Sequence, residues 1–211
     1  MKRREFLKTT GFSLLGMAAI CLGCGSSTAA PAANAATTNI TTKGANATMN
    51  KTNAKKVLVA YFSWSGNTRA LAQEIQKQTG GDLYEIVPAT AYPTVYKATT
   101  DQAKQEQQAG ARPAIKNNLP NVADYDVICL GYPNWWGSFP MPVATFVEKV
   151  NLQGKTIAPF FTHGGGGVQR CQSDLAKLAP NANFTDYLCL SGNSARSASG
   201  DVAQWLRKLG L

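Results

Sequence analysis

Three segments of this chain are apolar at nearly every position, and this pattern constrains the fold more than any other feature. They cover residues 57–62, 126–131 and 157–161. A strand with one face in water alternates apolar and polar residues, whereas a strand buried on both faces is apolar throughout. Two further strands are predicted at residues 83–87, where the pattern alternates as near a sheet edge, and at residues 187–190.

Amphipathic stretches lie between these strands. Leu71 and Ile75 share one face of a helix predicted over residues 68–78, which ends at Gly80, where a left-handed cap costs little. Residues 93–108 form a mostly polar predicted helix, which we expect to lie over the domain as the second crossover. Three more helices are marked by apolar residues at helical spacing: Val143, Phe146, Val147 and Val150; Val168, Cys171, Leu175 and Leu178; and Val202, Trp205, Leu206 and Leu209.

Strands that alternate with helices predict an α/β fold, with a doubly wound parallel sheet covered by helices on both faces. In such sheets, ligands bind at the carboxyl ends of the strands, near the point where the strand order reverses. The loops that follow the strands are therefore where a binding site is expected.

The loop after the first strand is rich in hydrogen-bonding groups. It reads Ser63-Trp64-Ser65-Gly66-Asn67-Thr68 and leads directly into the first predicted helix. Side-chain donors, backbone N–H groups and the positive end of the helix dipole then converge on one point, which suits a phosphate dianion. The loop lacks the Gly-Lys-Ser/Thr of a P-loop and the Gly-x-Gly-x-x-Gly of a dinucleotide turn. The alternative is that Asn67 or Thr68 simply caps the helix.

Two more loops carry unusual residues. The segment after the third strand contains Pro133, Asn134, Trp135, Trp136 and Gly137. Adjacent tryptophans are costly to leave in water, so they either pack against a ligand or cover the core. The segment after the fourth strand runs Thr162-His163-Gly164-Gly165-Gly166-Gly167, and its glycines either let backbone amides approach a flat or anionic group or form a loop without a ligand.

These three motifs, each after the expected strand, resemble those of the flavodoxin-like family, and the resemblance covers nearly the whole chain beyond residue 54. It implies a five-stranded sheet in the order 2-1-3-4-5 and bound FMN. It also implies that Ser63, Ser65, Asn67 and Thr68 hold the 5′-phosphate, and that the Pro133–Gly137 and Thr162–Gly167 loops bracket the ring. The candidates for stacking on the ring are Trp64, Trp135 and Trp136.

His163 departs from the family pattern, which commonly has a small hydroxyl residue at this point. A protonated imidazole beside the flavin would raise its reduction potential, and a local hydrogen bond is the alternative. The cysteines Cys129, Cys171 and Cys189 fall on apolar strands and an apolar helix face, so we expect buried free thiols. No metal ligands are assigned.

The first 24 residues have the three-part layout of an export signal: a basic start, an apolar stretch and small residues. Residues 3–8, Arg-Arg-Glu-Phe-Leu-Lys, resemble a twin-arginine signal, which exports folded proteins. Cys24 is a candidate for lipidation, and the alternative is an ordinary cut near Ala29, Ala30 or Ala35. Residues 25–53 are mostly Ala, Thr, Asn and Ser and predict a disordered tether, so residues 54–211 form the predicted domain.

The net charge of +9 is concentrated towards the N-terminus of the chain. Residues 54–211 hold 15 basic and 11 acidic residues, which leaves +4 in the predicted domain. This excess is too diffuse to indicate nucleic-acid binding. Membrane association is expected only through a lipid anchor on Cys24.

Two functions remain at this point. The first is an FMN-binding electron carrier that exchanges electrons with redox protein partners at the cell envelope, in the periplasm or on the outer face of the cell membrane. The second is an FMN-dependent NAD(P)H:quinone-type oxidoreductase acting on a small acceptor. The chain has no second nucleotide-binding motif and no evident acid/base pair, which favours the carrier.

Overall fold

The computed structural model of the protein describes residues 55–211. The predicted export signal at residues 1–24, the candidate lipidation site Cys24 and the predicted tether at residues 25–53 lie outside the described residues. In the described part, no helix combines the length and the apolar character that a membrane span requires.

The centre of the domain is a parallel sheet in the order β2-β1-β3-β4-β5, which confirms the predicted fold class. The strands are β1 (Val57–Tyr61), β2 (Asp82–Glu85), β3 (Val127–Pro133), β4 (Thr156–His163), β5 (Asn183–Phe184) and β6 (Leu188–Ser191). The helices are α1 (Asn67–Thr79), α2 (Tyr96–Gln108), α3 (Met141–Lys149), α4 (Cys171–Leu178) and α5 (Ser199–Leu209), with 3-10 turns η1 (Val122–Asp124) and η2 (Ala195–Ser197).

The last sheet position is filled by two short strands rather than the single one predicted. Both β5 and β6 pair in parallel with β4. Ile157 is opposite Phe184 and Phe160 is opposite Leu188. The segment that runs from β5 to β6 therefore contains one residue more than the stretch of β4 that it faces. The chain then continues from β6 into η2 and α5.

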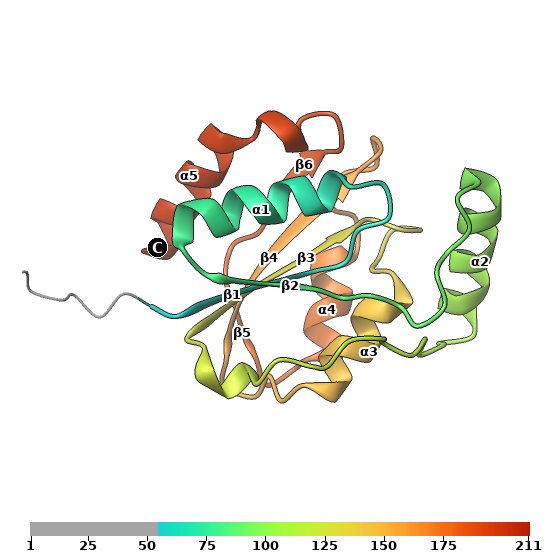
Figure 1. The fold of residues 1–211 in the computed structure, drawn as a ribbon, viewed down its shortest axis with the longest axis horizontal. Coiled ribbons are helices and arrows are strands. Elements are labelled where there is room, and N and C mark those ends of the chain that lie inside the picture. Colours follow the sequence, from blue (N-terminus) through green and yellow to red (C-terminus); the bar gives the residue numbers. More distant parts are fainter. Residues whose placement is uncertain (1–54) are drawn as a thin grey trace, which may run out of the picture. The chain divides into compact units, whose positions relative to one another are not determined.

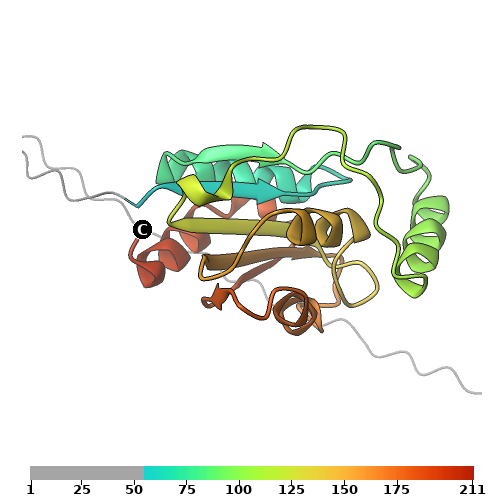
Figure 2. The ribbon, with the colours of Figure 1, turned by 90° about the horizontal axis from the view of Figure 1, so that it is seen from below.

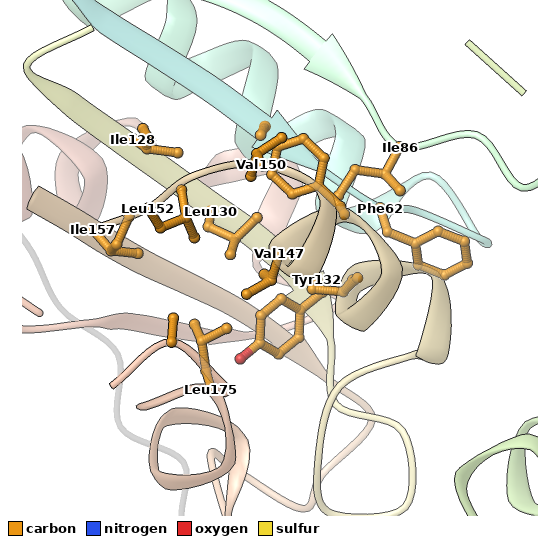
Figure 3. Close-up of a cluster of buried hydrophobic side chains, with 14 of the residues drawn as sticks. Phe62, Ile86, Ile128, Leu130, Tyr132, Val147, Val150, Leu152, Ile157 and Leu175 are labelled. Atoms are coloured by element: carbon orange, nitrogen blue, oxygen red, sulfur yellow. The ribbon is translucent and has the colours of Figure 1, made fainter. Parts of the chain in front are cut away.

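Helices cover both faces of the sheet, with α1 and α5 on one and α3 and α4 on the other (Figure 1). Alternate residues of each central strand enter one or the other of two buried clusters. In β3, for example, Ile128, Leu130 and Tyr132 pack towards α3 and α4, as Figure 3 shows for that cluster, whereas Val127 and Cys129 pack towards α1 and α5. This two-sided burial is why the strands are apolar throughout.

The helix boundaries follow their local signals, but two residues of the predicted apolar stripes lie outside their helices. Gly80 caps α1 with a φ of 66°, as its position after the apolar stripe predicted. The stripe of α5 is buried at Val202, Trp205 and Leu206 and half-buried at Leu209. Val150 is buried but follows the end of α3, and Val168 lies in the loop before α4, which begins only at Cys171.

Helix α2 lies beyond the carboxyl ends of the strands instead of across a face of the sheet (Figures 1 and 2). The predicted helix is confirmed, but the expectation that it lies over the domain is wrong. Only Thr99 and Ala103 are buried, so α2 has no apolar stripe with which to pack against the sheet. It therefore stands beside the loops where a ligand site is expected.

Candidate functional site

The loop between β1 and α1 forms a tight turn that starts the helix. Gly66 has a φ of 87°, which favours glycine, and its N–H donates to Ser63 Oγ at 3.2 Å. The first helical bond runs from Ala70 N–H to Gly66 O at 3.0 Å. Within the described part of the chain, no side chain caps this helix start. Its N–H groups and the positive end of its dipole are therefore available to an anion.

Thr68 is turned into the protein. Its side chain is 1% exposed, and its hydroxyl forms a hydrogen bond of 2.8 Å with the hydroxyl of Thr162 at the end of β4. Neither the helix-capping alternative nor a direct place in the cavity fits Thr68. This bond joins the first loop to the loop after β4.

Asn134 joins the loops that follow β3 and β4. Its backbone N–H donates to Thr162 O at 2.7 Å, and its amide Nδ2 donates to Gly167 O at 2.6 Å. Its amide Oδ1 accepts a hydrogen bond of 2.9 Å from Gly137 N–H. One side chain therefore fixes the relative position of the two loops.

Trp136 and Gly137 form the two-residue turn of a small hairpin. Trp135 and Ser138 exchange backbone hydrogen bonds of 3.0 and 3.1 Å across it, and both turn residues have positive φ, 53° and 82°. A two-residue turn with this geometry requires positive φ at both positions. For tryptophan this conformation is strained, so the contacts of Trp136 must hold it in place.

The two tryptophans differ in environment. Trp135 packs edge-on against Phe62 and Tyr92, with ring centroids 5.4 and 5.1 Å away. Trp136 is 48% exposed; its indole N–H donates to Thr100 O of α2 at 2.9 Å. Lys104 Nζ lies 5.0 Å from the centre of the Trp136 ring. The alternative that both tryptophans cover the core therefore holds in part for Trp135 and not for Trp136.

A third tryptophan, Trp64, is anchored at the same edge of the sheet. Its indole N–H donates to Pro93 O at 3.0 Å, in the segment that leads to α2. Its ring lies 6.2 Å from the ring of Tyr96, the first residue of α2, which is 72% exposed. The position of α2 thus brings an aromatic residue to the loop after β1.

His163 makes the local hydrogen bond that was the alternative to a tuning role. Its Nδ1 accepts from Gly165 N–H at 3.0 Å. Gly165 has a φ of 124°, a conformation open to glycine, and a Cβ at Gly164 or Gly165 would meet nothing within 4 Å. The glycine loop therefore leaves open space next to the imidazole.

The segment after β6 completes the site. Gly192 N–H donates to His163 O at 2.9 Å, which continues the pairing of β4 with β6. A Cβ at Gly192 would lie 2.4 Å from Nδ2 of Asn67. A side chain at this position would displace the Asn67 amide, because the loop after β6 approaches the start of α1 so closely.

These segments enclose a cavity of about 520 Å³, which we call the carboxyl-edge cavity. Within residues 55–211, its lining contains no Lys, Arg, Asp or Glu. The lining residues are Trp64, Ser65, Asn67, Tyr96, Pro133, Asn134, Trp135, Thr162, His163, Gly164, Gly165, Ser191, Gly192 and Asn193.

A smaller cavity of about 290 Å³ lies between α2 and the loop after β3, and we call it the α2 cavity. It shares Tyr96, Asn134 and Trp135 with the carboxyl-edge cavity, and it adds Thr100, Ala103 and Trp136. A third cavity, of about 440 Å³, lies among residues 147–153 and 178–182, in the loops that precede β4 and β5. No group of acidic, histidine or cysteine side chains in the described residues is arranged to hold a metal ion.

Residues 56–209 match the sequence profile of the Flavodoxin family. The chain belongs to the flavodoxin family.

Solved structures of proteins described as flavoproteins are also similar to this chain. A protein from Bacteroides uniformis, described as a flavoprotein, is 31% identical over 73% of this chain and 99% of its own, with a TM-score of 0.66. One from Bacteroides eggerthii is 35% identical over 71% and 98%, with a TM-score of 0.60. A flavoprotein from Lactobacillus acidophilus in complex with FMN is 26% identical over 72% and 99%, with a TM-score of 0.58.

In this member of the flavodoxin family, the residues predicted for the site divide into two groups. Ten of them line the carboxyl-edge cavity: Trp64, Ser65, Asn67, Pro133, Asn134, Trp135, Thr162, His163, Gly164 and Gly165. The other seven stand behind or beside it: Ser63, Gly66, Thr68, Trp136, Gly137, Gly166 and Gly167. Several of these seven hold the loops in place, as Ser63 does for Gly66 and Thr68 does for Thr162.

Four lining residues were missed: Tyr96, Ser191, Gly192 and Asn193. The last three could have been predicted from the sequence, because Ser-Gly-Asn directly follows the fifth predicted strand and ligands bind at the carboxyl ends of the strands. Tyr96 could not have been predicted, because its position depends on where α2 lies.

The three cysteines in the described residues are free thiols, as expected, but only Cys129 and Cys171 are fully buried. Burial raises the pKa of the Cys129 thiol to about 12 and that of Cys171 to about 12. Both thiols are therefore protonated and unreactive near neutral pH.

Proposed function

We propose that this protein is an FMN-binding electron carrier and that FMN binds in the carboxyl-edge cavity. The observation that carries the proposal is the meeting of two features in one cavity: the start of a helix that no described side chain caps, and three aromatic side chains, Trp64, Tyr96 and Trp135. FMN has both a phosphate dianion and a large planar ring. The cavity volume of about 520 Å³ lies within the usual range for cofactor sites, roughly 300–1,000 Å³.

The residues present fit the two parts of FMN. Ser65, Asn67 and the N–H groups of the first turn of α1 would hold the phosphate. The close approach of Gly192 to Asn67 keeps this end of the cavity narrow. The aromatic side chains and the glycine loop at Gly164 and Gly165 would face the ring. The flavoprotein from Lactobacillus acidophilus, whose structure contains FMN, supports the same choice of cofactor.

Bound FMN would supply the electron-transfer chemistry, and this chain would position it and exclude other reactions. Within the described residues, the only titratable side chains in the cavity lining are His163 and Tyr96. His163 Nδ1 already accepts a hydrogen bond from Gly165 N–H, and Tyr96 is 72% exposed, so neither group is held ready to pass protons to and from a bound substrate. This favours a carrier over an enzyme.

The α2 cavity supports the second candidate, an FMN-dependent NAD(P)H:quinone-type oxidoreductase. It adjoins the carboxyl-edge cavity, and Trp135 and Trp136 offer a partly apolar wall to a small planar acceptor. Its volume of about 290 Å³ is at the lower limit for a ligand site. We therefore rank this function second.

We also propose that the carrier acts at the cell envelope and exchanges electrons with a reductase and an acceptor protein. The support is in the sequence: residues 3–8 resemble a twin-arginine signal, and Cys24 is a candidate for lipidation. Mass spectrometry of the mature N-terminus tests this. A diacylglycerol on Cys24 is the expected result, and an N-terminus that retains residues 1–24 would contradict export.

The purified protein tests both the cofactor and the role. A visible spectrum with the absorption of oxidised flavin, at one FMN per chain, is expected. The carrier should oxidise NAD(P)H negligibly in the presence of quinones until an NAD(P)H-dependent flavoprotein reductase is added. Rapid turnover without the reductase would favour the second candidate. A colourless protein that does not take up added FMN would contradict both.

A further inference from the structure

Arg196 lies against the loop that starts α1. A Cβ placed on Gly66 would be 3.8 Å from Nη2 of Arg196. Gly66 is flanked by Ser65 and Asn67, both of which line the carboxyl-edge cavity. The guanidinium therefore stands beside the end of the cavity where the start of α1 presents its N–H groups.

The backbone that carries Arg196 is fixed from both sides. Ala195 and Ala198, before and after it, are 1% and 2% exposed and belong to the same buried cluster as Leu71 of α1. Within this turn, Ser197 N–H donates to Ser194 O at 3.0 Å. A short segment anchored against α1 thus directs a charged side chain towards the β1–α1 loop.

No carboxylate in the described part of the chain pairs with Arg196. Among the described residues, Arg69, Arg112 and Arg170 each pair with an acidic side chain, and none of the ion pairs includes Arg196. No hydrogen bond within residues 55–211 occupies its guanidinium either. The cavity lining itself contains no Lys or Arg, and the exposed Arg196 is the one basic side chain among the described residues that a Cβ on Gly66 would meet within 4 Å.

We infer that Arg196 is a phosphate-binding residue that makes the cavity selective for FMN over riboflavin. This inference rests on the proposed binding of FMN. A dianion held only by neutral donors and a helix end retains much of its charge, whereas a guanidinium adds charge-assisted hydrogen bonds to the phosphate oxygens. Arginine suits this role because its planar fork matches phosphate oxygens in pairs. Riboflavin has no phosphate and gains nothing from Arg196.

The test is the affinity of the full-length, flavin-free protein for FMN and for riboflavin, measured by quenching of flavin fluorescence. Arg196→Ala should weaken FMN binding about tenfold, which corresponds to about 1.4 kcal/mol, and leave riboflavin binding within about twofold. Arg196→Lys should lie between the two proteins. Arg207→Ala, which removes an exposed arginine from α5, is the matched control and should leave both affinities unchanged.

Ionic strength provides a second readout. The loss of FMN affinity in Arg196→Ala should shrink as ionic strength rises from about 0.01 M to about 0.15 M, because the screening length falls from about 30 Å to about 8 Å. Equal losses for FMN and riboflavin would mean that Arg196 only supports the loop and would overturn the inference. So would an unchanged affinity for FMN in Arg196→Ala. Failure of the parent protein to bind either flavin would overturn the proposed function as well, so the two failures can be told apart.

Discussion

The adjacent tryptophans Trp135 and Trp136 have different environments because of the backbone conformation of a single residue. The positive φ of Trp136 sends the two side chains in different directions, one to the aromatic cluster at Phe62 and the other to α2. The sequence predicted a functional loop here because two tryptophans in a row need a packing partner. It did not predict which would remain exposed, because that depends on a strained turn held by tertiary contacts.

Tyr84 gives a stability prediction at the residue scale. Its ring stacks on Phe146, but its hydroxyl is buried and has no hydrogen-bond partner among the described residues. Leaving a buried hydroxyl unpaired is unfavourable, so Tyr84→Phe should raise the free energy of unfolding by about 1 kcal/mol.

The matched control is Tyr132→Phe. The Tyr132 hydroxyl is also buried, but it donates to Cys171 O at 2.9 Å. This substitution should lower the free energy of unfolding by about 1 kcal/mol. Urea unfolding of both variants provides the measurement, and a loss of stability in Tyr84→Phe would refute the prediction.

Gly131 is needed for packing rather than for backbone freedom. A Cβ at this position of β3 would lie 2.0 Å from ring atoms of Phe160, its neighbour on β4. Gly131→Ala should therefore destabilise the protein by about 1–3 kcal/mol, because the buried ring cannot move away.

Gly200→Ala is the control for Gly131, since a Cβ there meets nothing within 4 Å. It lies in α5, where alanine is the better helix former, and should not lower the stability. Thermal unfolding of the two variants measures the difference. Equal melting temperatures would show that the sheet tolerates the extra methyl group.

At the scale of elements, α2 differs from the other helices in how it is held. It buries only Thr99 and Ala103, and it is attached mainly by hydrogen bonds, such as those from Tyr92 to Glu106 and from Trp136 to Thr100. A helix with few buried apolar contacts is expected to open locally more readily than the core. Its polar sequence predicted the helix but gave no face by which to locate it.

Tyr92→Phe tests this attachment, because it removes the hydroxyl that binds Glu106. Amide hydrogen exchange in α2 should become about fivefold faster, while exchange in the central strands stays unchanged. Tyr125→Phe, which removes a hydrogen bond of 2.8 Å to Asp82 at the amino end of the sheet, should leave α2 unaffected. Faster exchange throughout the domain would indicate a global effect and contradict the prediction.

The fifth position of the sheet is a second place where the sequence did not predict the structure in full. Leu188 and Cys189 were predicted in one strand, and they do pair with β4. The division into β5 and β6 follows from one extra residue in the register, which no local pattern marks. By contrast, β1, β3 and β4 could be predicted because burial on both faces leaves a signal in every residue.

For the molecule as a whole, buried and half-buried tyrosines and buried thiols make the free energy of unfolding depend on pH in the alkaline range. Burial is the largest cause of a raised pKa in Tyr61, Tyr84, Tyr92, Tyr125 and Tyr132, and in the thiols of Cys129 and Cys171. In the unfolded chain these groups lose their protons near their ordinary values of 9.0 for the thiols and 10.0 for the tyrosines.

At pH values between the pKa values of these groups in the unfolded chain and their higher pKa values in the folded protein, the folded protein binds more protons than the unfolded chain. The free energy of unfolding should therefore be at its full value below about pH 9, fall as the pH rises past it and fall more steeply above about pH 10. Urea unfolding at pH values from about 8 to about 11 measures this dependence. Stability that stays constant or increases over this range would be inconsistent with the buried tyrosines.

The central claim is that FMN binds in the carboxyl-edge cavity, and nuclear magnetic resonance tests it most directly. When FMN is added to the 15N-labelled, flavin-free protein, the largest amide shifts are expected in residues 63–68, 133–137, 162–167 and 191–196. These segments line the cavity or stand directly behind its lining. Shifts confined to residues 147–153 and 178–182, around the cavity in the loops before β4 and β5, would contradict the claim, and so would the absence of shifts at saturating FMN.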